Sequence, residues 1–190
     1  MNREYKIRPA QQSESRRIAK FYRMSSDGVA DYIWAMLAEP GQEILDVGEI
    51  RYAREGTDFS YQNCKLVETG NCAVAMLVAF PMHVDHDYVE DDPVLKPYSV
   101  LEEDNSYYIC GVAVDPDHRG QGIGTALMAE AENDAQAKGF AKLSLIVFEQ
   151  NSDAKRLYEK LGYREVMRET VVSHPLIHYS GDAVLMVKSL

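Results

Sequence analysis

The segment from Val112 to Leu127 constrains the fold more than any other part of the chain. It begins inside an apolar, β-branched run, 107–114, which predicts a buried strand that ends at Asp115-Pro116. The turn that follows contains Gly120, Gly122 and Gly124, and the residues after it predict a helix. A glycine-rich turn between a strand and a helix leaves backbone N–H groups free to surround an anion. The segment therefore predicts a phosphate-binding loop in an α/β fold.

The glycine spacing separates this loop from the other common phosphate loops. A Walker loop needs Gly-x-x-x-x-Gly-Lys-Ser/Thr, but no lysine occurs between Lys96 and Lys138. The dinucleotide fingerprint Gly-x-Gly-x-x-Gly needs a glycine where this chain has Thr125. The sequence matches Arg/Gln-x-x-Gly-x-Gly/Ala instead, from Arg119 to Gly124. Both alternative loops are therefore excluded.

The start of the helix after the loop favours an anion independently. Helices usually carry Asp or Glu there, because these charges offset the positive end of the macrodipole. No acidic residue occurs between His118 and Ala129. Free N–H groups and the guanidinium of Arg119 then form a site suited to a pyrophosphate.

A second motif, from Asn151 to Tyr163, reads Asn-x-x-Ala-x-x-Leu-Tyr-x-x-x-Gly-Tyr. Its asparagine is suited to cap a helix, and Gly162 is suited to end it. The two motifs together resemble those of the GNAT acetyltransferases, and the resemblance spans about residues 3–190. It implies one GNAT domain over 3–190 with an α/β (α+β) fold, in which helices flank both faces of a mixed, mostly antiparallel central sheet.

The resemblance implies an N-acetyltransferase that moves the acetyl group of acetyl-CoA to a primary amine of a small molecule, peptide or protein. A non-catalytic acyl-CoA sensor on the same fold is the alternative, but both motifs are intact, which favours the enzyme. The residues implied in acetyl-CoA binding are Val112, Ala113, Val114, Arg119, Gly120, Gln121, Gly122, Ile123, Gly124, Thr125, Asn151, Ala154 and Tyr158.

Tyr158 is the residue that the resemblance places beside the departing thiolate. Its phenol, with an ordinary pKa of about 10, can donate to a thiolate whose ordinary pKa is about 8.5. The alternative is that Tyr158 is a core aromatic.

The general base is left open between three residues. Family members that acetylate ribosomal-protein N-termini carry a glutamate five residues before the motif asparagine, where this chain has Ile146. Other members place an acidic base just before the strand that here starts at Tyr107, which points to Glu103 or Asp104. His178, in the last connection between strands, is the third candidate. We expect Glu103.

Residues 81–105 depart from the family pattern, which needs only a short turn there. The segment carries many acidic residues against the single Lys96, and three prolines interrupt it. A connection of this length is usually a functional lid or a disordered insert. We interpret it as an acidic flap beside the acceptor groove, which predicts a cationic amine. His83 and His86 lie in this loop without a strand or helix to fix them, so no metal site is expected.

Charge and apolar content restrict the partners and the location. The net charge of −10 argues against nucleic acid or an anionic membrane surface as a partner. The longest apolar run, 72–80, is too short to span a bilayer, and the first residues lack a signal peptide's hydrophobic segment. We expect a soluble, cytoplasmic protein. Dimers are frequent in the superfamily, so a homodimer is an open alternative to a monomer.

The three cysteines, Cys64, Cys72 and Cys110, show no paired spacing and are predicted to be buried thiols in a reducing compartment. The residue periodicity predicts the remaining elements. Strands are expected at 3–8, 62–69, 72–80, 107–114, 141–148, 164–172 and 183–187. Helices are expected from about residue 13, at 27–37, 43–54 and 123–138, and after Asn151.

Overall fold

The computed structural model of the chain describes residues 5–190. Within this range, seven strands are hydrogen-bonded in the order β1-β2-β3-β4-β5-β7-β6, which confirms the predicted mixed, mostly antiparallel sheet. The chain divides into two compact units. The first contains the described residues up to Ala79 together with Gly111–Met128, and the second contains Phe80–Cys110 together with Ala129–Leu190. Arg3, the predicted start of the first strand and of the domain, lies outside the described residues.

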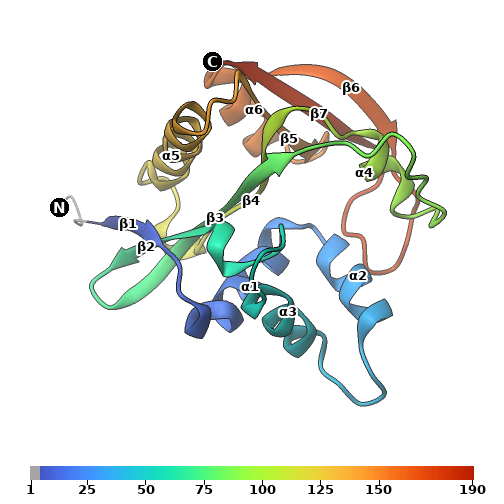
Figure 1. Ribbon diagram of the computed structural model, residues 1–190, viewed down its shortest axis with the longest axis horizontal. Helices are drawn as coiled ribbons and strands as arrows, with labels where there is room; N and C mark the ends of the chain where they lie inside the picture. The colour runs from blue at the N-terminus through green and yellow to red at the C-terminus, as the bar shows by residue number, and fades with distance from the viewer. Residues whose placement is uncertain (1–4) are drawn as a thin grey trace. The chain divides into compact units, whose positions relative to one another are not determined.

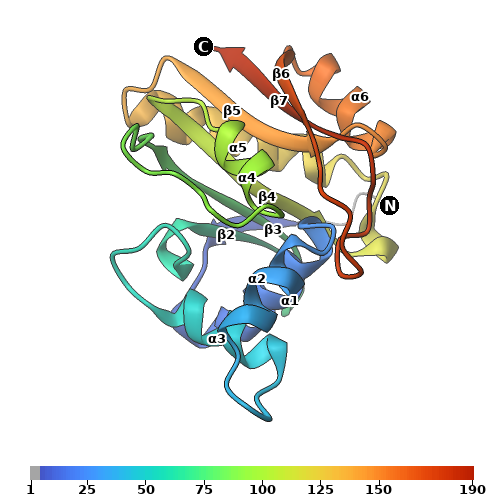
Figure 2. The ribbon, with the colours of Figure 1, turned by 90° about the vertical axis from the view of Figure 1, so that its right-hand side faces the viewer.

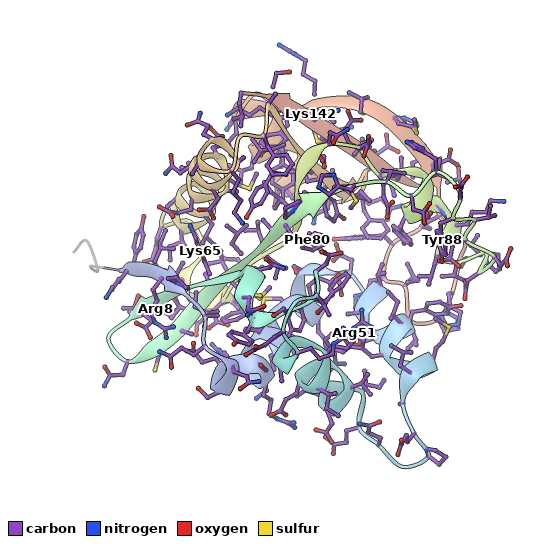
Figure 3. The ribbon with its side chains drawn as sticks, in the orientation of Figure 1. Arg8, Arg51, Lys65, Phe80, Tyr88 and Lys142 are labelled. Atoms are coloured by element: carbon purple, nitrogen blue, oxygen red, sulfur yellow. The ribbon has the colours of Figure 1, made fainter. Side chains whose placement is uncertain are left out.

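The first unit contains an antiparallel arrangement of β1 (Lys6–Pro9), β2 (Cys64–Thr69) and most of β3 (Cys72–Met82). β2 and β3 form the predicted hairpin, with Thr69 opposite Cys72 and a two-residue turn between them. Gly70 begins this turn at a φ of 61°, which a residue without a Cβ adopts easily. Figure 3 labels Arg8 on β1, which forms ion pairs with Glu14 and with Glu68 of β2.

The helices of the first unit are α1 (Ser15–Ser25), α2 (Val29–Leu37) and α3 (Ile44–Ala53) (Figure 1), and aromatic side chains from all three form one cluster. The Tyr22 ring centre lies 6.1 Å from that of Trp34 and 5.6 Å from that of Tyr52. Phe59, from the loop after α3, adds an edge-on contact with Tyr22 at 5.9 Å. Trp34 and Tyr52 are fully buried. Tyr22, Trp34 and Tyr52 are therefore core residues of the unit, and the half-buried Phe59 lies at the edge of their cluster.

Helix α1 packs closely on the last residues of β4 (Ser106–Val114) that belong to this unit. A Cβ added at Gly111 would lie 2.8 Å from Ser25 Oγ and 3.3 Å from the Tyr22 ring, so a glycine is needed there. Arg17 of α1 donates to Asp115 Oδ2 at 2.7 Å and to the carbonyl of Ala73 at 2.6 Å. These contacts fix the helix beside the point where β4 ends.

Strand β5 (Lys142–Phe148) is central in the second unit. It pairs along its whole length with antiparallel β7 (Asp182–Ser189), and β6 (Arg164–Thr170) lies on the outer side of β7 (Figure 2). The parallel pairing of β5 with β4 covers residues 107–109 and 143–145. Ser106 and Ser144, both fully buried, share a hydrogen bond of 2.6 Å that joins these two strands.

Helix α5 (Ile123–Ala137) follows the glycine loop, and α6 (Ser152–Lys160) follows β5. The predicted apolar stripe of α5 is confirmed, since Ile123, Leu127, Ala131 and Ala135 are at most 3% exposed. Short 3-10 turns complete the described elements: Gln12–Glu14, Tyr61–Asn63 and Pro116–His118.

The acidic segment 81–105 is built onto the second unit rather than being a plain loop. It contains α4 (Lys96–Val100). Asp92 closes the turn before this helix, because its carboxylate accepts the N–H groups of Val94 at 2.8 Å and Leu95 at 3.3 Å. The Tyr98 ring lies 6.1 Å from Phe148 at the end of β5, and Phe148 lies 5.2 Å from Tyr179 in the β6–β7 connection. Aromatic contacts therefore hold the segment to the sheet.

One expectation about the cysteines is wrong. Cys64 is buried and Cys110 is half-buried, but Cys72 is exposed. Cys72 is the first residue of β3, directly after the tight turn, and the strand becomes buried only from Val74 onward. An apolar run in the sequence does not show at which residue other parts of the chain begin to bury the strand.

Gly48 allows α3 to approach the Trp34 ring. A Cβ added at Gly48 would lie 2.4 Å from two ring atoms of Trp34. We expect Gly48→Ala to lower the free energy of unfolding by about 1–3 kcal/mol, because overpacking outweighs the roughly 1 kcal/mol gain in helix propensity. Ile50, 58% exposed on the same helix, is the control, and Ile50→Ala should change this energy by less than about 0.5 kcal/mol. Urea unfolding measures both, and an unchanged Gly48 variant would contradict the clash.

Candidate functional site

The glycine loop lies exposed between the 3-10 turn at 116–118 and helix α5. Gly120 and Gly122 have φ values of 70° and 80°, in the left-handed region that side chains disfavour. A Cβ added at either glycine would meet no atom within 4 Å. The loop therefore has the required glycine backbone and an open surface in front of it.

The backbone of this loop is suited to an anion. Helix α5 begins at Ile123, and its described first turn carries no acidic residue. The first N–H groups of a helix have no acceptor within the helix. At the start of α5, the N–H of Ala126 donates to the carbonyl of Gly122 at 3.0 Å. The free N–H groups, the positive end of the helix dipole and the open space in front of the glycines together fit a pyrophosphate group.

Arg119 folds back over the end of β4. Its Nε donates to the Val114 carbonyl at 3.1 Å, and its Nη2 lies 3.7 Å from the Met24 sulfur. A guanidinium has five N–H donors, and these two contacts use only part of them. Arg119 thus ties the loop to the strand while its side chain remains exposed.

The end of β4 presents its backbone in a defined direction. The N–H of Asp115 donates to the carbonyl of Val74 on β3 at 2.8 Å. Backbone N–H groups alternate between the two edges of a strand, so those of Val112 and Val114 face the edge away from β3. Ala113 between them is 4% exposed and packs into the core.

The second motif is folded as its sequence predicts. Asn151 Oδ1 accepts the N–H of Ala154 at 3.4 Å, which confirms the cap of α6. Tyr158 is half-buried, and its ring centre lies 6.0 Å from that of Tyr163.

Tyr163 differs from Tyr158 in its surroundings. It is 1% exposed, and its hydroxyl has no hydrogen-bond partner among the described residues. Burial, with a smaller contribution from Glu132, raises the pKa of Tyr163 far above the usual range. The hydroxyl of Tyr163 is therefore a buried, neutral group inside the packing of the second unit.

The candidate bases have different partners in the second unit. Glu103 forms an ion pair with Lys142. Figure 3 labels Lys142 at the start of β5. Asp104 accepts the N–H of Val84 at 3.0 Å, and this hydrogen bond is the main reason that the pKa of Asp104 is lowered. His178 lies exposed in the connection between β6 and β7.

Glu102 is a carboxylate that sequence reasoning missed. Desolvation raises the pKa of its carboxyl group, although the residue as a whole is exposed. The negative charge of Glu102 is one of the smaller contributions that raise the pKa of the Tyr88 and Tyr108 phenols. The Tyr108 ring packs edge-on against Phe80, with ring centres 5.6 Å apart. The sequence contains no signal for this difference, because residues 102–104 form one uninterrupted acidic run.

The structure brings the predicted residues 112–114 and 119–125 together in the first unit. The predicted residues Asn151, Ala154, Tyr158, Glu103 and His178 belong to the second unit. Among residues 5–190, no group of three or more His, Cys, Asp or Glu side chains is placed to hold a metal ion. No helix in that range has both the length and the apolar character needed to cross a membrane.

The model of the acetyltransferase (GNAT) family matches residues 30–163. The [ribosomal protein bS18]-alanine N-acetyltransferase of Escherichia coli strain K12 is 43% identical over 76 residues, which are 40% of this chain and 50% of that protein. The match thus spans about half the length of this curated relative.

Solved structures of acetyltransferases share the fold. A crystal structure described as an acetyltransferase has a TM-score of 0.68 at 20% identity and covers 97% of this chain and 98% of its own. A chain of the NatC complex bound to Gag peptide and CoA has a TM-score of 0.61 at 19% identity and covers 98% and 99%. The family match spans most of the chain and includes both the glycine loop and the Asn151 motif, so the chain belongs to the GNAT acetyltransferase family.

Proposed function

We propose that this protein is an acetyl-CoA-dependent N-acetyltransferase that acts on a primary amine. The observation that carries the proposal is the glycine loop, with two glycines at positive φ, open space in front of them and an acid-free helix start. Family membership supports the proposal, as does the CoA bound to a protein of the same fold. Acetyl-CoA supplies the acetyl group as an activated thioester.

The residues of the first unit are assigned to holding the acyl donor. The N–H groups of residues 120–125 bind the pyrophosphate, and the unused donors of Arg119 add charge-assisted contacts. The N–H groups of Val112 and Val114, which face away from β3, bind the donor along the strand edge and stabilise the oxyanion of the tetrahedral intermediate. Ala113 forms the buried floor between them.

The residues of the second unit are assigned to the leaving group and the acceptor. Asn151 and Ala154 begin the helix that carries Tyr158, and the phenol of Tyr158 donates a proton or hydrogen bond to the departing thiolate. His178 lies exposed in the β6–β7 connection, where it is available to the acceptor amine. Glu103, paired with Lys142, orders the chain just before β4.

The acidic segment 81–105 is assigned to the acceptor side of the acetyltransferase domain, and it favours a cationic amine. Asp92 already accepts the N–H groups of Val94 and Leu95 in the turn before α4, so the attraction of the amine is assigned to its neighbours. Asp91 is exposed, and Glu90 accepts the Tyr88 hydroxyl at 2.8 Å. Carboxylates and a phenol ring side by side suit an ammonium group.

A panel of amines tests the function. We expect acetyl-CoA-dependent release of free CoA thiol with amines that carry a second positive charge, and slower release with neutral amines. The preference should weaken as salt increases, because exposed charges are screened. Binding of acetyl-CoA without thiol release for any amine would instead identify a non-catalytic sensor.

Gly122→Val tests the pyrophosphate loop. The added side chain occupies the open space in front of the N–H groups, and loss of one or two charge-assisted contacts should weaken acetyl-CoA binding by about 10- to 100-fold. Isothermal titration calorimetry measures the dissociation constant.

Gly139→Val is the matched control for backbone strain. Gly139 has the same φ of 80° and also has no atom within 4 Å of an added Cβ, but it lies at the end of α5. Equal loss of affinity in both variants would assign the effect to strain and remove the loop from binding.

Tyr158→Phe tests the proton donor. We expect kcat to fall by roughly 10²-fold with little change in the KM for acetyl-CoA, because the donor is needed mainly as the thiolate forms. Tyr163→Phe removes the neighbouring hydroxyl, which has no described hydrogen-bond partner, and should leave kcat unchanged. An unchanged kcat in Tyr158→Phe would make Tyr158 a packing residue.

A further inference from the structure

We propose that Arg17 of helix α1 is a positioning residue for the acyl donor. It holds Asp115 in front of the glycine loop, and it cancels the negative charge that Asp115 would otherwise present to the pyrophosphate. The inference rests on the proposed binding of acetyl-CoA, and it adds a residue that lies outside both sequence motifs. Every residue that carries it belongs to the first unit.

Asp115 connects β4 to the turn that leads into the glycine loop, and its N–H, its carbonyl and its carboxylate all have partners. The N–H donates to the Val74 carbonyl on β3 at 2.8 Å, and the carbonyl accepts the N–H of His118 at 2.9 Å. The carboxylate accepts a hydrogen bond from Arg17 at 2.7 Å. Strand β3, the 3-10 turn and helix α1 are thus tied together at one residue.

The Arg17 guanidinium is itself held in place. Its Nη2 donates to Asp115 Oδ2 and also, at 2.6 Å, to the Ala73 carbonyl on β3. The central carbon of the guanidinium lies 4.4 Å from the ring centre of Phe21, which is 1% exposed. A cation over the face of an aromatic ring is attracted to it, so the buried ring fixes the guanidinium. Arg17 therefore fastens Asp115 to β3 from a rigid position.

A second contact joins α1 to the glycine loop itself. The Met24 sulfur lies 3.7 Å from Arg119 Nη2. Met24 follows Arg17 by seven residues, about two helical turns, so the two side chains leave the same side of the helix. Together with the close approach at Gly111, these contacts place α1 against the chain at residues 111, 115 and 119. Helix α1 is therefore the support on which the loop is positioned.

The charge of Asp115 gives Arg17 its second role. Asp115 lies five residues before Gly120 and is half-buried, so its carboxylate alone would oppose an anion bound at the loop. The ion pair with Arg17 removes this opposition. Asp117 also precedes the loop, but it is exposed, and water and salt screen its charge. Asp115 is thus the acid that needs a paired cation.

Arg17→Gln and Arg16→Gln, in the full-length chain, form the decisive pair. Arg16 is the matched control, because it is adjacent on α1, its side chain is 42% exposed against 41% for Arg17, and it also bonds carboxylates, those of Asp46 and Glu49. We expect the dissociation constant of acetyl-CoA, measured by isothermal titration calorimetry, to rise by about 10-fold in Arg17→Gln and to stay unchanged in Arg16→Gln. Urea unfolding verifies that both variants are folded.

Two further readouts separate positioning of the donor from a purely structural role. The loss of affinity in Arg17→Gln should shrink as salt increases, because a repulsion between charges is screened. At saturating acetyl-CoA, kcat should change by less than about 2-fold while the KM for acetyl-CoA rises, because Arg17 acts through Asp115 and not on the reacting atoms. Arg17→Lys, which retains the charge, should bind more tightly than Arg17→Gln.

Asp115→Asn tests the charge directly. The amide oxygen can still accept the hydrogen bond from Arg17, so this variant should bind acetyl-CoA at least as tightly as the wild type. Added to Arg17→Gln, it should restore most of the lost affinity. A wild-type dissociation constant in Arg17→Gln, an equal loss in Arg16→Gln, or a 10-fold loss in Asp115→Asn alone would overturn the inference. The last of these outcomes remains decisive even if Arg17→Gln does not fold.

The same titrations separate this inference from the proposed function. A wild type that binds acetyl-CoA, together with an Arg17→Gln variant that binds it equally well, rejects the role of Arg17 alone. A wild type that does not bind acetyl-CoA rejects the acetyltransferase function, and the role of Arg17 with it.

Discussion

The hydrogen bond from the Asp115 N–H to the Val74 carbonyl sets the direction in which β4 presents its backbone. It fixes the N–H groups of Val112 and Val114 on the edge away from β3, and it holds the strand end from which the glycine loop departs. Arg17 reinforces it by bonding Asp115 and the Ala73 carbonyl together. Because a loop cannot direct its donors unless its ends are fixed, the candidate pyrophosphate site depends on this contact.

The local chemistry of the chain was sufficient to predict most elements of the fold. The stripe of α5, the Asn151 cap and the tight turn at Gly70 depend on residues close in sequence, and the structure confirms each of them. The Cys72 prediction failed because exposure at a strand end depends on what covers it. Likewise, Asp92 closes the turn before α4, and the five residues of this helix are too few to show a period in the sequence.

Long-range contacts explain why the candidate site was predicted less completely than the fold. Glu103 meets Lys142, 39 residues away, and Asp104 meets the N–H of Val84, 20 residues away in the opposite direction. A single sequence contains no trace of either pairing, so three adjacent acids look equivalent. The glycine loop is different, because its φ angles, its glycines and its helix start all lie within a few residues.

The Glu103–Lys142 ion pair also makes the loop before β4 sensitive to its length. It is one of the two contacts, with the hydrogen bond from the Val84 N–H to Asp104, that give the acids of the run 102–104 different surroundings, and it depends on the register of the loop. The insertion or deletion of one residue between Leu101 and Ser106 would bring a different carboxylate opposite Lys142. The acid that pairs with Lys142 is therefore set by the length of the loop and not by its composition.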